Sequence, residues 1–149
     1  MSLCASCGLC CTGELFASIE VLPEETPRIE AKRLPIVRET GRAKIPQPCP
    51  AHDGTCSIYA DRPRACATFR CAPLLAVEAG EASFPEAEAR LARAKRLAAS
   101  VRARVPGRGA LFRDLESLVV DTPEWRRDNA ALVMDIAVLR ALLDRIRGD

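Results

Sequence analysis

The chain has 149 residues, of which 48% are hydrophobic and 4% aromatic, and its formal net charge is +2. This length suits one domain, or a small domain with an extension, and the small net charge gives no reason to expect a strongly acidic or basic partner. No run approaches the roughly 18 apolar residues of a membrane span, and no secretory signal precedes the first cysteine. We therefore expect a cytoplasmic protein that does not enter a membrane.

The first half of the sequence predicts several short elements. Hydrophobic alternation within Glu14–Val21 predicts a strand, and the proline and glutamates that begin Pro23–Leu34 predict a short helix. In Ile45–Tyr59 an Asp-Gly pair predicts the turn of a β-hairpin, with Cys49 on one arm and Cys56 on the other. A further short helix is expected to begin at a cap from Asp61 and to end near Cys71.

The second half is predominantly helical in pattern. Apolar residues recur at three- and four-residue steps from Pro85 onward and predict an amphipathic helix: Ala87, Leu91, Ala94, Ala98, Val101 and Val105. Residues Leu111–Val120 fit either a helix or a strand. Asp121 or Thr122 is expected to cap a last helix with Pro123 in its first turn. This helix would place one broad apolar face toward the core: Trp125, Leu132, Val133, Ile136, Leu139 and Leu143.

These elements predict an α+β protein in two parts. Residues 2–75 are expected to form a small cysteine-ligated metal domain with a short β-hairpin and short helices. Residues 85–147 form a C-terminal helical extension that packs on the first part as one compact unit. Because the first part has few aromatic and aliphatic residues, we expect metal to contribute much of its folding free energy.

All eight cysteines lie before Ala72, and four of them stand in CASCGLCC at the N-terminus. In the cytosol, thiols at such tight spacing are more often metal ligands or redox groups than a disulfide framework. Two cysteines separated by two residues present both sulfurs to one metal, whereas direct neighbours point to opposite faces in extended chain and diverge by about 100° in a helix. Cys10 and Cys11 are therefore expected to serve different centres, or different iron atoms of one cluster.

Three interpretations of the cysteines stay open. In the first, Cys4, Cys7 and Cys10 bind a four-iron, four-sulfide cluster with the spacing of bacterial ferredoxins, Cys49-Pro50 supplies the remote ligand, and the other four hold a second centre such as zinc. In the second, eight thiolates form two closed zinc sites. In the third, the sites are open and the metal is cargo or catalyst. Soft thiolates select zinc, copper(I) or iron–sulfur centres in each case.

The cysteines and the residues between them resemble a known family. CASCGLCC followed by CPAHDGTCSIYADRPRACATFRC is similar to the CxxCxxCC family, a zinc- or iron-chelating domain of bacterial proteins, over about the first half of the chain. The resemblance implies eight metal ligands: Cys4, Cys7, Cys10, Cys11, Cys49, Cys56, Cys66 and Cys71. Ile58, Tyr59, Arg62 and Pro63 also match the motif, and Ala67 departs from it where an arginine often stands.

The resemblance implies a metal-binding function. We expect a bacterial, cytoplasmic protein that holds an iron–sulfur cluster of the 4Fe-4S type, zinc, or both, for redox, assembly or structural-binding roles with a protein partner. The alternative is an enzyme or enzyme subunit with a substrate-accessible iron–sulfur centre, because larger relatives include flagellin lysine methylases. The chain is short for the extra cofactor-binding domain of such an enzyme, so the sequence does not favour this alternative and assigns no catalytic residue.

Other residues have simpler interpretations. The single histidine, His52, is expected to be an exposed turn residue rather than a ligand, and Tyr59 to pack the hairpin against the following helix. Three arginines near the last cysteines can offset the negative charge of thiolate centres: Arg62, Arg64 and Arg70. The basic run Arg90–Arg108 is expected to be a solvated helix face, because no aromatic residues are interleaved with it as in a nucleic-acid site.

Overall fold

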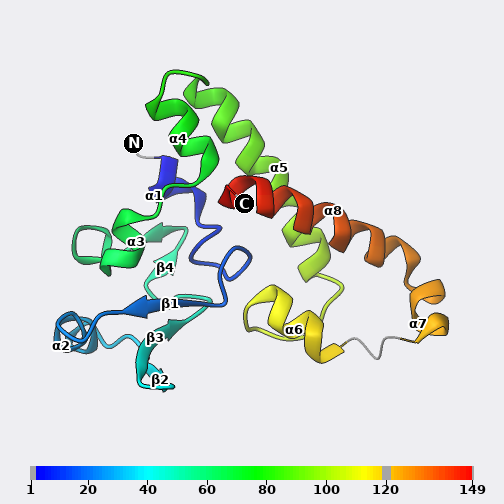
Figure 1. The fold of residues 1–149 in the computed structure, drawn as a ribbon. Coiled ribbons are helices and arrows are strands. Elements are labelled where there is room, and N and C mark those ends of the chain that lie inside the picture. Colours follow the sequence, from blue (N-terminus) through cyan, green and yellow to red (C-terminus); the bar gives the residue numbers. More distant parts are fainter. Residues whose placement is uncertain (1–2, 119–121, 149) are drawn as a thin grey trace.

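A computed structural model describes residues 3–118 and 122–148. A small antiparallel sheet with short helices lies beside a group of longer helices (Figure 1), which confirms the predicted α+β class. The first part contains α1 (Leu3–Cys7), β1 (Ser18–Val21), α2 (Thr26–Ala31), β2 (Val37–Glu39), β3 (Arg42–Pro46), β4 (His52–Asp53), β5 (Thr55–Cys56), a 3-10 turn (Tyr59–Asp61) and α3 (Arg64–Thr68). The helices that follow are α4 (Ala72–Glu78), α5 (Phe84–Arg102), α6 (Leu111–Leu118), α7 (Pro123–Asp128) and α8 (Ala130–Arg147).

The sheet has three antiparallel strands in the order β1-β3-β2. The predicted strand is present as β1 but begins only at Ser18, and Ile19 lies opposite Ile45 of β3. Strands β2 and β3 form a hairpin that the hydrophobic pattern did not reveal, because every residue of β2 is exposed. Thr40 and Gly41 at its turn have φ of 49° and 78°, as a two-residue turn with the twist of the strands requires.

The second hairpin is tighter than predicted. Strands β4 and β5 pair His52 with Cys56 and Asp53 with Thr55, so Gly54 alone forms the connection, at a φ of 72°. Cys56 lies on an arm as expected, but Cys49 does not, because it precedes β4 by three residues. The backbone N–H of His52 instead donates to the carbonyl of Cys49 at 3.0 Å, and this turn leads the chain into β4.

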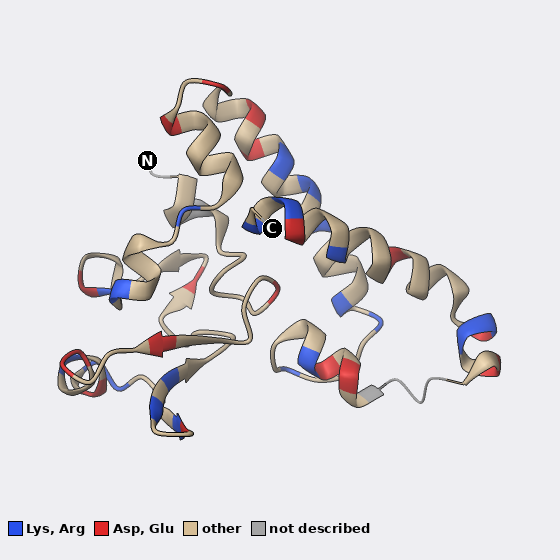
Figure 2. Ribbon diagram, viewed as in Figure 1, with Lys and Arg blue, Asp and Glu red and all other residues tan. Residues whose placement is uncertain are grey.

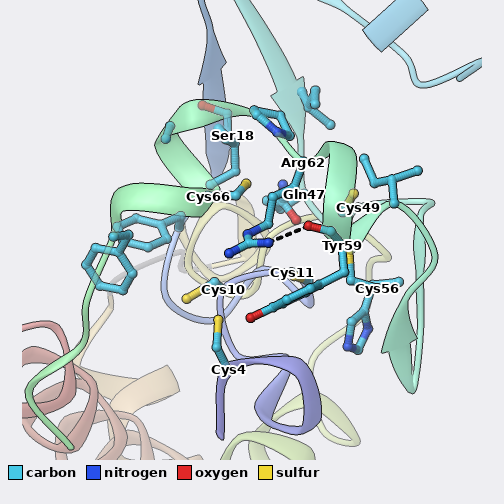
Figure 3. A pocket seen from close by; sticks show the side chains of 18 of the residues that line it. Cys4, Cys10, Cys11, Ser18, Gln47, Cys49, Cys56, Tyr59, Arg62 and Cys66 are labelled. Carbon is cyan, nitrogen blue, oxygen red and sulfur yellow. Dashed lines mark hydrogen bonds between the residues drawn. The ribbon is translucent and has the colours of Figure 1, made fainter. Parts of the chain in front are cut away.

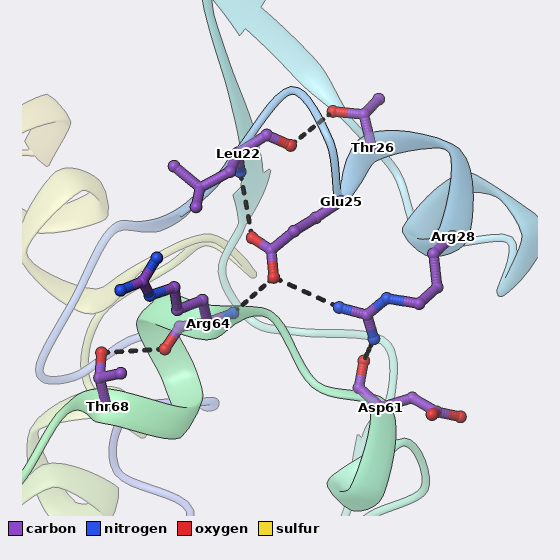
Figure 4. Close-up of polar contacts among 7 residues, drawn as sticks. All are labelled: Leu22, Glu25, Thr26, Arg28, Asp61, Arg64 and Thr68. Carbon is purple, nitrogen blue, oxygen red and sulfur yellow. Dashed lines mark hydrogen bonds and ion pairs between the residues drawn. The ribbon is translucent and has the colours of Figure 1, made fainter.

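The predicted cap of the next helix is wrong, and a more distant residue supplies it. Asp61 belongs to the 3-10 turn and pairs with Lys32 at 2.8 Å, and the N-cap position of α3 is Pro63. The backbone N–H of Arg64 donates to Glu25 Oε1 at 2.8 Å (Figure 4). Glu25 therefore joins α2 to the start of α3. The helix then ends at Thr68, and Cys71 is the N-cap residue of α4, a helix that the sequence did not predict.

The predicted amphipathic helix is confirmed as α5, and it begins with a capping box. Ser83 Oγ accepts from the N–H of Glu86, and the Glu86 carboxylate accepts from the N–H of Ser83 at 2.8 Å, which satisfies two otherwise unpaired groups at the helix start. All six predicted core residues are buried: Ala87, Leu91, Ala94, Ala98, Val101 and Val105.

The last predicted helix is two helices. Thr122 caps α7 by accepting from the N–H of Trp125 at 3.2 Å, but α7 ends at Asp128. The side chain of Asn129 donates to the carbonyl of Trp125 at 3.0 Å, and such local bonds compete with helix continuation. The half-buried Trp125 is thus separated from the buried face of α8, which comprises Leu132, Leu139, Leu143 and Ile146.

The unassigned segment after α5 is helix α6 as far as Leu118. The rest of that prediction, Val119 and Val120, and the alternative cap Asp121 lie outside the described residues. Within residues 3–118 and 122–148, no helix has the length and hydropathy needed to cross a membrane.

Two groups of buried residues stabilise the fold, and the larger one joins the N-terminus to the long helices. Leu3, Leu9 and Leu15 are 3%, 2% and 5% exposed and pack with buried residues of α5, α6 and α8. The smaller group lies between the sheet and α2: Val21, Ile29, Leu34, Ala43, Ile45 and Ala51. The segment that carries the first four cysteines is therefore anchored in the core of the helical part.

Charged residues of the helical part are largely paired with one another. On α5 the acidic residues lie in the first turns, and lysine and arginine follow along the rest of the helix (Figure 2). Arg102 donates to Asp114 at 2.6 Å, and Arg104 pairs with Asp135 of α8. These ion pairs place two members of the basic run against neighbouring helices rather than on a continuous basic surface.

Replacement of Leu139 by alanine is predicted to reduce the free energy of unfolding by about 2–5 kcal/mol, because the buried side chain leaves a cavity. Leu139 is 0% exposed, whereas Met134 on the same helix is 65% exposed. Met134→Ala is the matched control and should change stability by less than about 0.5 kcal/mol. Chemical denaturation followed by circular dichroism measures both, and equal losses would contradict the assignment of the buried face.

Candidate metal centre

The N-terminal loop turns sharply between its leucines and presents its cysteines together. Gly8 follows α1 with a φ of 77°, a conformation that costs other residues about 1–2 kcal/mol. Its carbonyl accepts from the N–H groups of Cys11 and Thr12 at 2.8 and 2.9 Å. Because Leu3 and Leu9 point into the helical core, the cysteines of the loop are left at the edge of that core.

Three later segments bring the remaining cysteines to this loop. The backbone N–H of Cys49 donates to the carbonyl of Cys11 at 2.7 Å, which ties the two segments together directly. Helix α1 packs against both β5, which carries Cys56, and α5. Cys66 lies on α3, which packs on β1, and Cys71 lies between α3 and α4.

One group of interacting thiols includes the first three cysteines of the chain. Burial raises the pKa of the Cys7 thiol, and the charges of Cys71 and Cys4 raise it further, whereas a backbone hydrogen bond at Leu9 and the charge of Lys95 lower it. Burial also raises the pKa of Cys10 strongly, and four neighbouring thiols add repulsion: Cys7, Cys11, Cys4 and Cys71. We call Cys4, Cys7, Cys10 and Cys71 the first thiol set.

A second group of interacting thiols includes Cys11, the neighbour of Cys10 in the sequence. Burial raises the pKa of Cys11 to about 12, and the charges of three remote thiols (Cys49, Cys56 and Cys66) and then of Cys4 contribute to the rise. Burial and then the charges of Cys49 and Cys56 raise the pKa of Cys66 to about 12, against the opposing charge of Arg62. We call Cys11, Cys49, Cys56 and Cys66 the second thiol set.

The two sets divide the adjacent cysteines between them. Cys10 interacts mainly with the first set and Cys11 mainly with the second, and they still interact with each other. The remote neighbour of Cys4, Cys7 and Cys10 is Cys71, whereas Cys49 lies with Cys11. Cys49, the remote ligand in the ferredoxin-like interpretation, donates its backbone N–H to the carbonyl of Cys11, and the grouping of the cysteines into centres stays a prediction.

A cavity of about 290 Å³ opens between these elements (Figure 3). Six cysteines line it: Cys4 and Cys10 of the first set and all four of the second. Its remaining wall is largely apolar and includes Phe16, Ile19, Ile45, Ile58 and Phe69. Cys7 lies instead along a groove that Lys95 of α5 also lines.

Three buried polar atoms in the cavity wall have no hydrogen-bond partner: Gln47 Oε1, His52 Nε2 and Arg62 Nε. Gln47 is only 5% exposed. Buried polar atoms are nearly always paired, so unpaired ones call for a group that the polypeptide does not supply. A thiolate-bound metal centre fits the nitrogens of His52 and Arg62, because its sulfurs accept hydrogen bonds and the eight thiols are soft ligands, whereas Gln47 Oε1 is itself an acceptor and needs a donor.

The thiols lie near one another, but their sulfurs do not surround a single position as the ligands of a bound metal do. Within the described residues, no group of three or more histidine, cysteine, aspartate or glutamate side chains already has the arrangement of a metal site. Metal uptake by these residues thus requires the sulfurs to draw together, and the exposed Cys4 at the N-terminus can move with the least loss of packing.

Several predictions about the residues around the thiols need correction. His52 is not an exposed turn residue: it is half-buried, and its ring packs so closely on Gly8 that a Cβ there would lie 2.7 Å from it. Tyr59 lines the cavity and carries the Arg62 guanidinium 3.9 Å above its ring centre. Of the three candidate arginines, Arg62 alone lines the cavity among the described residues, while Arg70 pairs with Glu78 at 3.3 Å.

Comparison with known families agrees with this arrangement. The family model CxxCxxCC, described as "Putative zinc- or iron-chelating domain", matches residues 3–94. The chain belongs to the CxxCxxCC family. Among curated proteins and among solved structures, no match was found. The matched region of this CxxCxxCC chain contains every cysteine. It continues beyond Leu75 through α4 and ends at Ala94 within α5, the helix on which the N-terminal loop packs.

Replacement of Gly8 by alanine is predicted to destabilise the protein and to lower its metal content. The positive φ and the contact with His52 both oppose a side chain at this position. Gly54 has a similar φ of 72° but no atom within 4 Å of an added Cβ, so Gly54→Ala carries the conformational cost of about 1–2 kcal/mol alone. Denaturation of both variants should show the larger loss for Gly8→Ala, and equal losses would contradict the packing of His52 on the loop.

The metal-free protein is predicted to lose stability as the pH rises above about 9. The pKa of Cys11 and that of Cys66 are raised from 9.0 to about 12 on folding, so the folded state holds protons that the unfolded state releases in this range. The stabilisation is complete below pH 9 and is lost as the pH approaches 12. Urea denaturation at stepped pH measures this, and Cys11→Ser should flatten the dependence. A stability that is constant above pH 9 would contradict the burial of these thiols.

Proposed function

We propose that this CxxCxxCC chain is a metal-binding protein with two four-thiolate centres, one in each thiol set. The first centre would use Cys4, Cys7, Cys10 and Cys71, and the second Cys11, Cys49, Cys56 and Cys66. The observation that supports this most strongly is the division of the adjacent Cys10 and Cys11 between two groups of interacting thiols. Neighbouring cysteines rarely reach one metal ion, and two separate centres give each sulfur a ligand role.

The two sets suit different metals. The first set contains the two-residue spacings that are typical of 4Fe-4S ligation, and we assign an iron–sulfur cluster to it. The second set takes one cysteine from each of four segments (the loop, the turn before β4, β5 and α3), and four thiolates are a common ligand set of a structural zinc ion. The second centre would then fix these segments around the cavity.

We assign the protein to redox, assembly or structural-binding roles in the cytoplasm, with a protein as its partner. Supporting this, Cys4 of the first set is exposed, which gives another protein access to that centre. When bound, an iron–sulfur cluster supplies one-electron redox chemistry, and zinc supplies a rigid link between chain segments. The chain's own residues would hold these groups and exclude water from them.

A second candidate function, an enzyme with a substrate-accessible centre, is supported by the cavity itself. A pocket of about 290 Å³ with an apolar wall and a few polar groups resembles small-molecule sites in size and character. A shift in the spectrum of the loaded protein when small exogenous ligands are added would favour this function. An unchanged spectrum would favour a closed centre.

The proposal is tested by elemental analysis of protein purified without oxygen. We expect about four iron and four sulfide per chain together with about one zinc, and a brown colour. Cys10→Ser should remove the iron and keep the zinc, whereas Cys11→Ser, one residue along, should remove the zinc and keep the iron. His52→Ala is the control and should retain both metals.

Different outcomes would overturn different parts of the proposal. Loss of the same metal in Cys10→Ser and Cys11→Ser would show that the adjacent cysteines serve one centre. Colourless protein with two zinc ions would overturn the assignment of iron–sulfur to the first set and leave the division of the cysteines intact. Wild-type protein that binds neither metal would overturn the function.

A further inference from the structure

Arg62 holds a positive charge inside the cavity between the two thiol sets. Its side chain is half-buried and extends from the turn after the 3-10 helix toward the centre of the cavity (Figure 3). The guanidinium lies 3.9 Å above the centre of the Tyr59 ring, and Nη1 donates to the Tyr59 carbonyl. No other lysine or arginine of the described residues lines this cavity.

Two contacts hold the guanidinium in place but do not satisfy it. The aromatic face attracts a cation, and the carbonyl accepts one of its five N–H groups. Nε is buried and has no partner, and a buried cation without its full set of partners costs free energy. In the absence of metal, the Arg62 side chain therefore keeps a buried N–H group unpaired.

Once the second thiol set binds metal, its thiolates supply the negative charge and the hydrogen-bond acceptors that the guanidinium lacks. Four thiolates around one divalent ion carry a net charge of −2, which nearby cations or N–H groups must offset. All four cysteines of that set line the same cavity as Arg62. The planar guanidinium presents several N–H groups at once and keeps its charge at any physiological pH.

We propose that Arg62 is the charge-compensating residue of the second centre, a positioning residue that favours the metal-loaded state by donating N–H groups toward the thiolate sulfurs. This inference rests on the proposed function. It explains why the side chain is directed into an apolar cavity although solvent is close, and why Arg62 differs from its neighbours Arg64 and Arg70. Arg64 is exposed, and Arg70 is paired with Glu78.

This role predicts that loss of the Arg62 side chain lowers the affinity for zinc without lowering the stability of the metal-free protein. Arg62→Met keeps the length of the side chain but removes the charge and the donors. Affinity for zinc, measured by competition with a chromophoric chelator, should fall about 10- to 100-fold, as expected for loss of a residue that supports metal ligands. The free energy of unfolding of the metal-free variant should stay equal to that of the wild type or rise, because an incompletely paired cation has been removed.

Two further variants separate charge from general effects. Arg62→Lys keeps the charge without the planar donors and should recover part of the affinity. Arg64→Met removes an exposed charge two residues away and should leave both quantities unchanged. Circular dichroism of each variant verifies folding, and cobalt(II) in place of zinc gives a thiolate spectrum that reports the ligand set independently of affinity.

The result that overturns the inference is distinct from the one that overturns the proposed function. Wild-type protein that binds no zinc or cobalt(II) removes the proposed function and the role of Arg62 with it. Wild-type binding together with unchanged affinity in Arg62→Met removes the role of Arg62 alone. A parallel fall in affinity and in metal-free stability would also overturn it, because that pattern indicates a purely structural side chain.

Discussion

Burial of the leucines that alternate with cysteines in the N-terminal loop is the constraint on which the rest of the structure depends. Leu3, Leu9 and Leu15 pack into the core formed with the long helices, and Gly8 reverses the chain between the first two. The sulfurs of the loop therefore stay close together at the edge of this core. Burial, with a further contribution from the charges of nearby thiols, raises the pKa of Cys7, Cys10 and Cys11, and hydrophobic contacts that would be lost if the loop moved away keep these thiols in place.

The remote cysteines lie on separate elements, and other contacts hold these elements near the loop. Cys49 is tied to Cys11 through the backbone, and the start of α3, which carries Cys66, is held by the carboxylate of Glu25 from α2. Phe16 of the loop and Phe69 after α3 meet edge to face at 5.0 Å. Sheet, loop and short helices thus surround the cavity through contacts that do not involve sulfur.

The sequence predicted those features that rest on local chemistry. The apolar spacing of α5 and the cap at Thr122 both follow from side-chain directions and capping within a few residues. Features that depend on distant partners could not be predicted. The cap of α3 comes from Glu25, which lies 39 residues away, and the burial of His52 depends on its contact with Gly8. The break at Asn129 had a visible signal, since asparagine side chains often compete with helical hydrogen bonds.

The position of the hydrophobic core changes how metal binding and folding are related. A cysteine-rich segment with few apolar residues was expected to depend on metal for most of its folding free energy. Here its leucines share a core with α5 and α8, so the long helices contribute to holding the loop. What remains unsatisfied is local: Gln47, His52 and Arg62 each keep a buried polar atom without a partner, at a cost of about 1–3 kcal/mol for each such group. That cost falls on the cavity, not on the fold as a whole. Thiolates bound to a metal there would accept from the nitrogens of His52 and Arg62 and relieve that part of the cost, while the helical scaffold stays as it is.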